Sequence, residues 1–159
     1  MAFLVLGLLA TLCVLQAFYY YPRLPQQVYA HFGESGRPDG AASKQVLLVV
    51  YLGACALSGL LVWLSSRVQR GLEHQIKLPN RDYWLAPERR QQTLDFLSRG
   101  FLWFAAATLA LMIDLFHQVF EVNLRGGGPL AHPKLSLGLY VGFAVVFAVA
   151  LQLRFRQPS

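Results

Sequence analysis

The chain has 159 residues, of which 55% are hydrophobic and 14% are charged, whereas soluble domains usually carry about 25% charged residues. This composition excludes a disordered chain and favours a protein embedded in a lipid bilayer. The net charge of +6 is typical of basic loops at a membrane surface, so no nucleic-acid partner is expected.

The first apolar stretch covers residues 2–21 and contains no charged side chain. About 20 helical residues, each rising about 1.5 Å, cross the hydrocarbon layer, so this stretch predicts a transmembrane helix. No basic residue precedes it and no small-residue cleavage site follows it, which favours a retained helix over a cleaved signal peptide.

The connection after the first span is rich in residues that form turns. Gly36 and the run Pro38-Asp39-Gly40 are typical of tight turns, and Ser43 is placed to cap the helix that follows. The sequence therefore predicts an ordered loop between the first two spans.

Three further apolar runs cover approximately residues 45–66, 100–121 and 135–153. Because lipid offers no hydrogen-bond partners to the backbone, each run is expected to be a helix. We therefore predict an all-α membrane protein with four transmembrane helices, forming one integral-membrane domain over residues 1–159.

Between the second and third spans, Tyr83 and Trp84 form an aromatic pair suited to the headgroup boundary. Pro87 and Glu88 then resemble the first turn of a helix, with Leu94 and Leu97 on one side. This pattern predicts an interfacial helix on the cytoplasmic side, leading into the third span.

Two segments of the chain carry a family resemblance. The run LPQQVYAHFGESGRPDGAASK is similar to a motif of a bacterial membrane domain of unknown function, which also occurs in the SdpI family of toxin-immunity and signalling proteins. The run LPNRDYWLAPERR resembles a box that accompanies that motif in short members. The residues that match are Pro25, His31, Phe32, Gly36, Asp39, Ser43, Lys44, Asn80, Arg81, Asp82, Tyr83, Trp84, Glu88 and Arg89.

The resemblance covers the first two spans and extends into the third. It implies a short, four-helix member of this group, in which immunity or signalling is the expected role. The SdpI proteins are longer and have additional helices, and the biochemical role of the domain is largely unassigned.

Asp114, His117 and Glu121 form a polar group within the third span. Their spacing places them within about 60° of one another on one helix face. Counted from Gly100, they lie about 21 to 31 Å along the helix, in the outer part of the bilayer. A carboxylate at that depth costs about 2.5 to 3.5 kcal/mol, so Asp114 is expected to have a partner.

Three interpretations of this polar face remain open. It could join His31 in ligating a divalent metal such as zinc, through His31, Asp114, His117 and Glu121, although no established metal motif is present and no other cofactor is predicted. It could bind an extracytoplasmic ligand or peptide, with His31, Asp39 and Lys44 from the outer loop. It could instead be a structural network, for example between Asp114 and Arg37 or Lys44. His74 and His132 are expected to be plain surface residues.

The distribution of basic residues predicts the orientation of the chain. Nine lie on the side of the termini, namely Arg67, Arg70, Lys77, Arg81, Arg89, Arg90, Arg99, Arg154 and Arg156, and five on the other, namely Arg23, Arg37, Lys44, Arg125 and Lys134. The positive-inside rule then places both termini in the cytoplasm. The expected location is the bacterial inner membrane.

No motif of a hydrolase, kinase or oxidoreductase is present, so an enzyme is the less favoured class. The expected function is recognition, regulation or immunity-type protection through an outward-facing polar pocket. One alternative is a metal-dependent membrane enzyme in which Asp114 or Glu121 acts as a base. Another is a subunit of a larger membrane complex, or a homodimer, that docks through the GxxxG pair Gly138 and Gly142.

Overall fold

The computed structural model describes residues 1–69 and 78–156 and is 75% helical. Its four long helices are α1 (Ala2–Tyr20), α2 (Lys44–Gln69), α4 (Pro87–Leu124) and α5 (Pro133–Arg156). All four are long and apolar enough to cross a bilayer. The prediction of a four-helix membrane protein is therefore confirmed. His74, which was predicted to be a plain surface residue, lies outside the described residues.

A small β-hairpin replaces the predicted loop between α1 and α2. Strands β1 (Gln27–Phe32) and β2 (Pro38–Ser43) pair antiparallel, with Val28 opposite Ala42. Gly36 has a φ of 74°, a conformation that glycine adopts without strain. The Ser43 hydroxyl accepts a hydrogen bond of 3.3 Å from the Val46 backbone N–H, so the predicted cap of the second span is confirmed.

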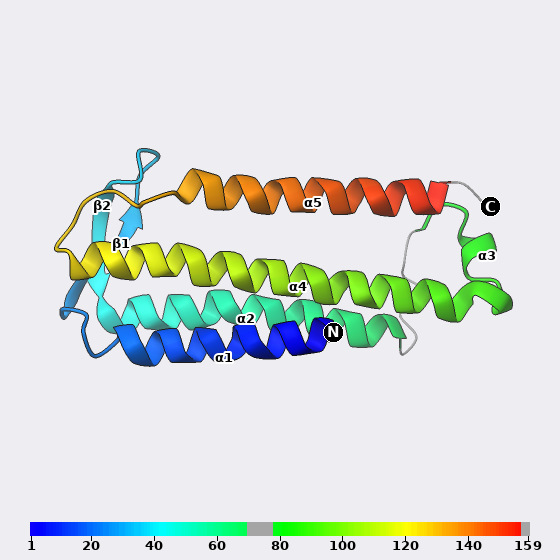
Figure 1. Ribbon diagram of the computed structural model, residues 1–159, viewed down its shortest axis with the longest axis horizontal. Helices are drawn as coiled ribbons and strands as arrows, with labels where there is room; N and C mark the ends of the chain where they lie inside the picture. The colour runs from blue at the N-terminus through cyan, green and yellow to red at the C-terminus, as the bar shows by residue number, and fades with distance from the viewer. Residues whose placement is uncertain (70–77, 157–159) are drawn as a thin grey trace.

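Helix α4 is the centre of the bundle, with α1 and α2 on one side and α5 on the other (Figure 1). The largest core cluster joins α4 to α1, α2 and the hairpin. Within it, the fully buried Tyr51 donates a hydrogen bond of 2.5 Å to the Gln16 side chain. Gln16 in turn donates one of 3.1 Å to the Ile113 carbonyl of α4. These bonds satisfy polar groups that would be costly to leave unpaired inside the bundle.

Helix α5 packs mainly against α4. The Phe104 ring of α4 contacts the rings of Tyr140, Phe143 and Phe147, at centroid distances of 5.9, 5.6 and 5.4 Å. Gly100 lies so close to α5 that an added Cβ would approach the Phe147 ring to 2.7 Å. The contact therefore depends on a small residue in α4 facing an aromatic residue in α5.

The predicted interfacial helix and the predicted third span are one continuous helix. Helix α4 has 38 residues and is about 57 Å long, which exceeds the roughly 30 Å of the hydrocarbon layer. Gly100 interrupts no backbone hydrogen bond, and the stretch holds no internal proline, so nothing ends the helix between its two parts. In the described residues 78–86, just before α4, the chain forms the short helix α3 (Arg81–Trp84).

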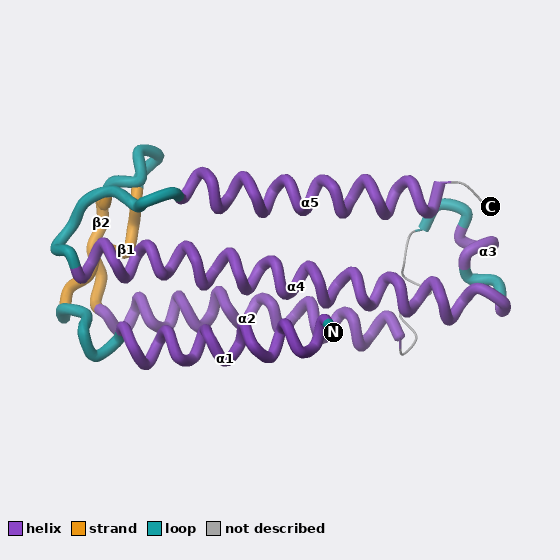
Figure 2. The backbone as a smooth tube through the Cα atoms, in the orientation of Figure 1, coloured by secondary structure: helices purple, strands orange, loops and turns teal. Residues whose placement is uncertain are grey.

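The two ends of the bundle differ in character. The hairpin end carries β1, β2 and the connection 125–132, which lie together in the tube view (Figure 2). The basic end carries α3, the start of α4 and the ends of α2 and α5, with the described residues Arg67, Arg81, Arg89, Arg90, Arg99, Arg154 and Arg156. The start of α1 and the end of α5 both lie towards the basic end (Figure 1).

Candidate functional site

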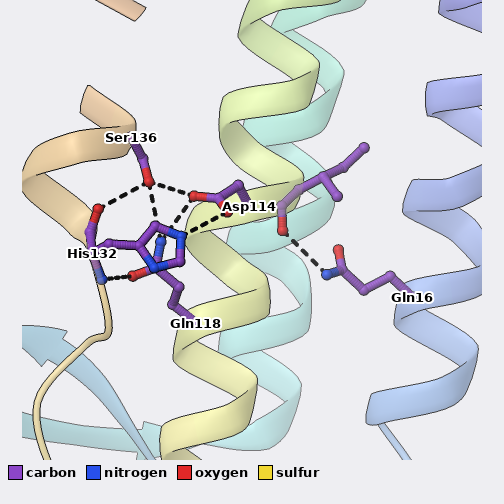
Figure 3. A network of polar contacts seen from close by, with 6 residues as sticks. Gln16, Asp114, Gln118, His132 and Ser136 are labelled. Atoms are coloured by element: carbon purple, nitrogen blue, oxygen red, sulfur yellow. Dashed lines mark hydrogen bonds and ion pairs between the residues drawn. The ribbon is translucent and has the colours of Figure 1, made fainter. Parts of the chain in front are cut away.

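Asp114 is the centre of a polar network between α4 and α5 (Figure 3). Its carboxylate accepts hydrogen bonds of 2.5 Å from the Ser136 hydroxyl and 2.8 Å from the Gln118 amide. His132 Nε2 lies 3.4 Å from the other carboxylate oxygen. The partners that the sequence required for Asp114 are therefore Gln118 of the same helix, His132 of the connection and Ser136 of α5, rather than Arg37 or Lys44.

The positions of these donors follow from helix geometry. Gln118 lies one turn after Asp114 on α4, and Ser136 lies one turn after His132 at the start of α5. The Gln118 side chain also accepts a hydrogen bond of 2.9 Å from the His132 backbone N–H. The two antiparallel helices are thus joined at the point where the chain passes from one to the other.

A hollow of about 390 Å³ opens beside Asp114 between the two helices. Its polar lining comes from Asp114, His132, Ser136 and Tyr140, and its apolar lining from Ala107, Ala110, Leu111, Leu139 and Phe143. The Asp114 and His132 side chains are 39% and 48% exposed. The Asp114 side chain is therefore partly exposed beside the hollow, which is also lined by two of its polar neighbours, His132 and Ser136.

His117 and Glu121 belong to a different contact, on the side of α4 that faces α1. The Tyr20 hydroxyl donates a hydrogen bond of 2.7 Å to Glu121 and lies 2.9 Å from His117 Nδ1. The Tyr20 ring is buried and stacks on Phe120 at 4.9 Å. The predicted face of α4 thus borders both α1 and α5, and its members bind different neighbours.

The outer-loop residues form a third contact. His31 and Asp39 pair with each other across the hairpin, and both side chains are largely exposed. Lys44 lies over the Tyr21 ring, with 4.9 Å from its Nζ to the ring centroid. Among the described residues, no hydrogen bond or ion pair joins these three side chains to Asp114, His117 or Glu121.

The expected convergence of His31, Asp114, His117 and Glu121 is therefore not formed. Within residues 1–69 and 78–156, no group of three or more His, Cys, Asp and Glu side chains is placed to hold a metal ion. The physical reason is the direction of the side chains. His31 pairs with Asp39 on the opposite strand of the hairpin. Asp114 and Glu121 instead accept hydrogen bonds from hydroxyl groups on the adjacent helices.

Sequence reasoning missed four residues that complete these contacts: Tyr20, Gln118, His132 and Ser136. His132 was expected to be a plain surface residue, but it lines the hollow. The sequence does hold one signal for three of these residues. Asp114 and Gln118 are four residues apart, and so are His132 and Ser136. Two polar pairs at that spacing, on helices joined by a short connection, are placed to face each other.

The hairpin holds this connection in place. The Gly36 carbonyl accepts a hydrogen bond of 2.9 Å from the Leu130 backbone N–H. On α4, the Asn123 side chain accepts a bond of 2.6 Å from the Tyr29 N–H and donates one of 2.9 Å to the Tyr29 carbonyl. The hairpin is therefore attached both to the last turns of α4 and to the connection that carries His132.

Two features noted in the sequence, Trp84 and the glycine pair of α5, lie away from the hollow. Trp84 is only 9% exposed, because it packs against Phe155 instead of facing headgroups. Gly138 and Gly142 lie on a face of α5 where an added Cβ would meet no atom within 4 Å. Docking of a partner or a second copy on that face stays a prediction.

Comparison with known families supports the resemblance of the first part of the chain to a domain of unknown function. Residues 8–54 match the model of a family described as a domain of unknown function (DUF1648). The matched segment covers most of α1, the whole hairpin and the first part of α2. No curated protein and no solved structure is detectably similar to the chain. The protein is thus a membrane protein with a segment similar to a domain of unassigned role.

Proposed function

We propose that this protein is a membrane recognition protein, which binds a cationic amphipathic peptide in the hollow between α4 and α5. The observation that carries the proposal is the half-exposed carboxylate of Asp114 in a hollow with a mostly apolar lining. Ligand sites commonly combine an apolar wall with a few placed polar groups. A peptide with a basic side chain and an apolar face has the matching chemistry.

The contacts around Asp114 favour a cationic ligand over a metal. Ser136 and Gln118 are neutral donors, and both bind the same oxygen of the Asp114 carboxylate. A lysine or arginine entering from the hollow would supply the opposite charge that a carboxylate in a membrane requires. A metal enzyme would need more carboxylate and imidazole ligands at one point than the described residues bring together.

The proposal includes an orientation, with the hairpin end outside the cytoplasm and both termini inside it. It is supported by the basic residues gathered at the opposite end of the bundle. The resemblance of the loop motif to the SdpI group, noted from the sequence alone, is the reason to propose protection against a toxic peptide, or signalling of its presence. The hairpin contributes by fixing the connection that bears His132.

The proposal predicts that Asp114→Asn weakens peptide binding about tenfold to hundredfold, because a charge-assisted hydrogen bond contributes about 1.5 to 3 kcal/mol. The measurement uses the full chain in phosphatidylcholine nanodiscs and a fluorescent, lysine-rich amphipathic peptide. Asp82→Asn, an exposed acidic residue at the basic end, is the matched control and should bind like the parent protein. Equal binding by the parent protein and Asp114→Asn, or no binding by the parent protein, would contradict the proposal.

A further inference from the structure

A second hollow lies at the basic end of the bundle, where the first turn of α1 meets α2 and α4. Its volume is about 380 Å³, and its lining includes Phe3, Gly59, Trp63, Ser98, Arg99 and Leu102. It is separate from the Asp114 hollow, because the two have no lining residue in common. The function proposed above does not involve it.

The polar part of this hollow is formed by a contact between two helices. The Ser65 hydroxyl of α2 and the Ser98 hydroxyl of α4 lie 2.6 Å apart, and both side chains are buried. Because Arg67 and Arg99 lie within two residues of these serines, this contact holds two basic positions at the same level of the bundle.

Both arginines are exposed, and only Arg99 is itself part of the lining of the hollow. The Arg67 guanidinium stacks over the Trp63 ring, with 4.7 Å between its Cζ and the ring centroid, and Trp63 lines the hollow. Arg99 lines the hollow directly, and its Nε donates a hydrogen bond of 3.2 Å to the Asp95 carbonyl. Among the described residues, neither guanidinium forms an ion pair with a carboxylate.

The order of chemistry along the hollow matches a phospholipid. The arginines and serines lie towards the end of the bundle, while Phe3, Gly59 and Leu102 provide apolar walls towards the bilayer interior. Basic pockets between transmembrane helices bind anionic headgroups, and guanidinium groups suit phosphate because they donate parallel hydrogen bonds. We infer that this hollow binds one anionic phospholipid, with its phosphate between Arg67 and Arg99 and an acyl chain along Gly59.

The experiment measures phospholipid binding to the full chain in detergent by native mass spectrometry, with phosphatidylglycerol and phosphatidylcholine as probes at equal concentration. The parent protein should retain phosphatidylglycerol preferentially. The double variant Arg67→Gln/Arg99→Gln should lose about fivefold in phosphatidylglycerol affinity per arginine. Arg23→Gln/Arg125→Gln, which removes the same charge at the hairpin end, should leave the affinity unchanged.

A second variant tests the acyl-chain part without changing charge. An added Cβ at Gly59 meets no atom within 4 Å, so Gly59→Leu should fold normally, fill the hollow and reduce phosphatidylglycerol retention. Gly53→Leu is the matched control, because Gly53 has equal space on the same helix and does not line the hollow. The inference is overturned if the parent protein shows no preference for phosphatidylglycerol. It is also overturned if either test variant binds as well as its control.

Discussion

Single polar atoms inside the bundle have large effects, because a membrane interior offers no water to replace a missing hydrogen bond. Tyr51 and Gln16 satisfy each other and a backbone carbonyl of α4. Ser65 and Ser98 likewise satisfy each other. Ser58 differs, since its buried hydroxyl has no hydrogen-bond partner among the described residues.

This difference predicts opposite effects for two serine substitutions in α2. Ser58→Ala removes an unsatisfied hydroxyl and should raise the free energy of unfolding by about 1 kcal/mol. Ser65→Ala leaves the buried Ser98 hydroxyl without its partner and should lower the free energy of unfolding by a similar amount. Thermal unfolding of both variants in the same detergent measures the contrast. A lower melting temperature for Ser58→Ala would contradict this account.

Among the secondary-structure elements, the short helix α3 and the residue before it bind the last carbonyl groups of α5. The Asn80 side chain donates hydrogen bonds of 3.2 and 3.0 Å to the carbonyls of Phe155 and Arg156, and Trp84 Nε1 donates one of 3.2 Å to the Phe155 carbonyl. The last carbonyls of a helix have no partner within it. The Asn80 to Trp84 part of the sequence motif therefore caps a distant helix.

Removing this cap should loosen the last turn of α5. Trp84→Phe keeps an aromatic ring against Phe155 but removes the donor, so amide exchange in that turn should become about fivefold faster for the loss of about 1 kcal/mol. Trp103→Phe, at a tryptophan that is 42% exposed on α4, is the control and should leave that exchange unchanged. Hydrogen-exchange mass spectrometry provides the measurement, and equal rates in the two variants would count against a capping role.

At the scale of the whole molecule, the two ends of the bundle are chemically distinct. The hairpin and the connection 125–132 close one end, and most of the described basic residues lie at the other. The proposed ligand hollow lies near the first end and the proposed lipid hollow near the second. The proposed recognition of an extracytoplasmic ligand requires the hairpin end to face outwards.

This orientation is tested by labelling single cysteines in a background with Cys13→Ala and Cys55→Ala. A membrane-impermeant maleimide added to intact cells should label Ser35→Cys in the hairpin turn and should not label Gln92→Cys on α4, since both positions are exposed but lie at opposite ends. After lysis both should react. The reverse pattern would place the hairpin in the cytoplasm and remove the basis for an extracytoplasmic ligand.

The four spans, the turn at Gly36 and the cap at Ser43 could all be predicted from the chain alone. Each depends on local chemistry, since apolar length, backbone preference and a neighbouring N–H act over a few residues. The hairpin itself was predicted only as an ordered loop, because its strands are short and their sequences, QVYAHF and PDGAAS, do not alternate between apolar and polar residues.

The partners of the polar residues depend on contacts between segments far apart in sequence. Asp114, His117 and Glu121 share a helix face. In the packed bundle, however, Asp114 binds Ser136 of α5 and Glu121 binds Tyr20 of α1. Helical periodicity specifies the face of a helix and leaves its neighbours unspecified. The positions of α1 and α5 around α4 therefore set the composition of the candidate site.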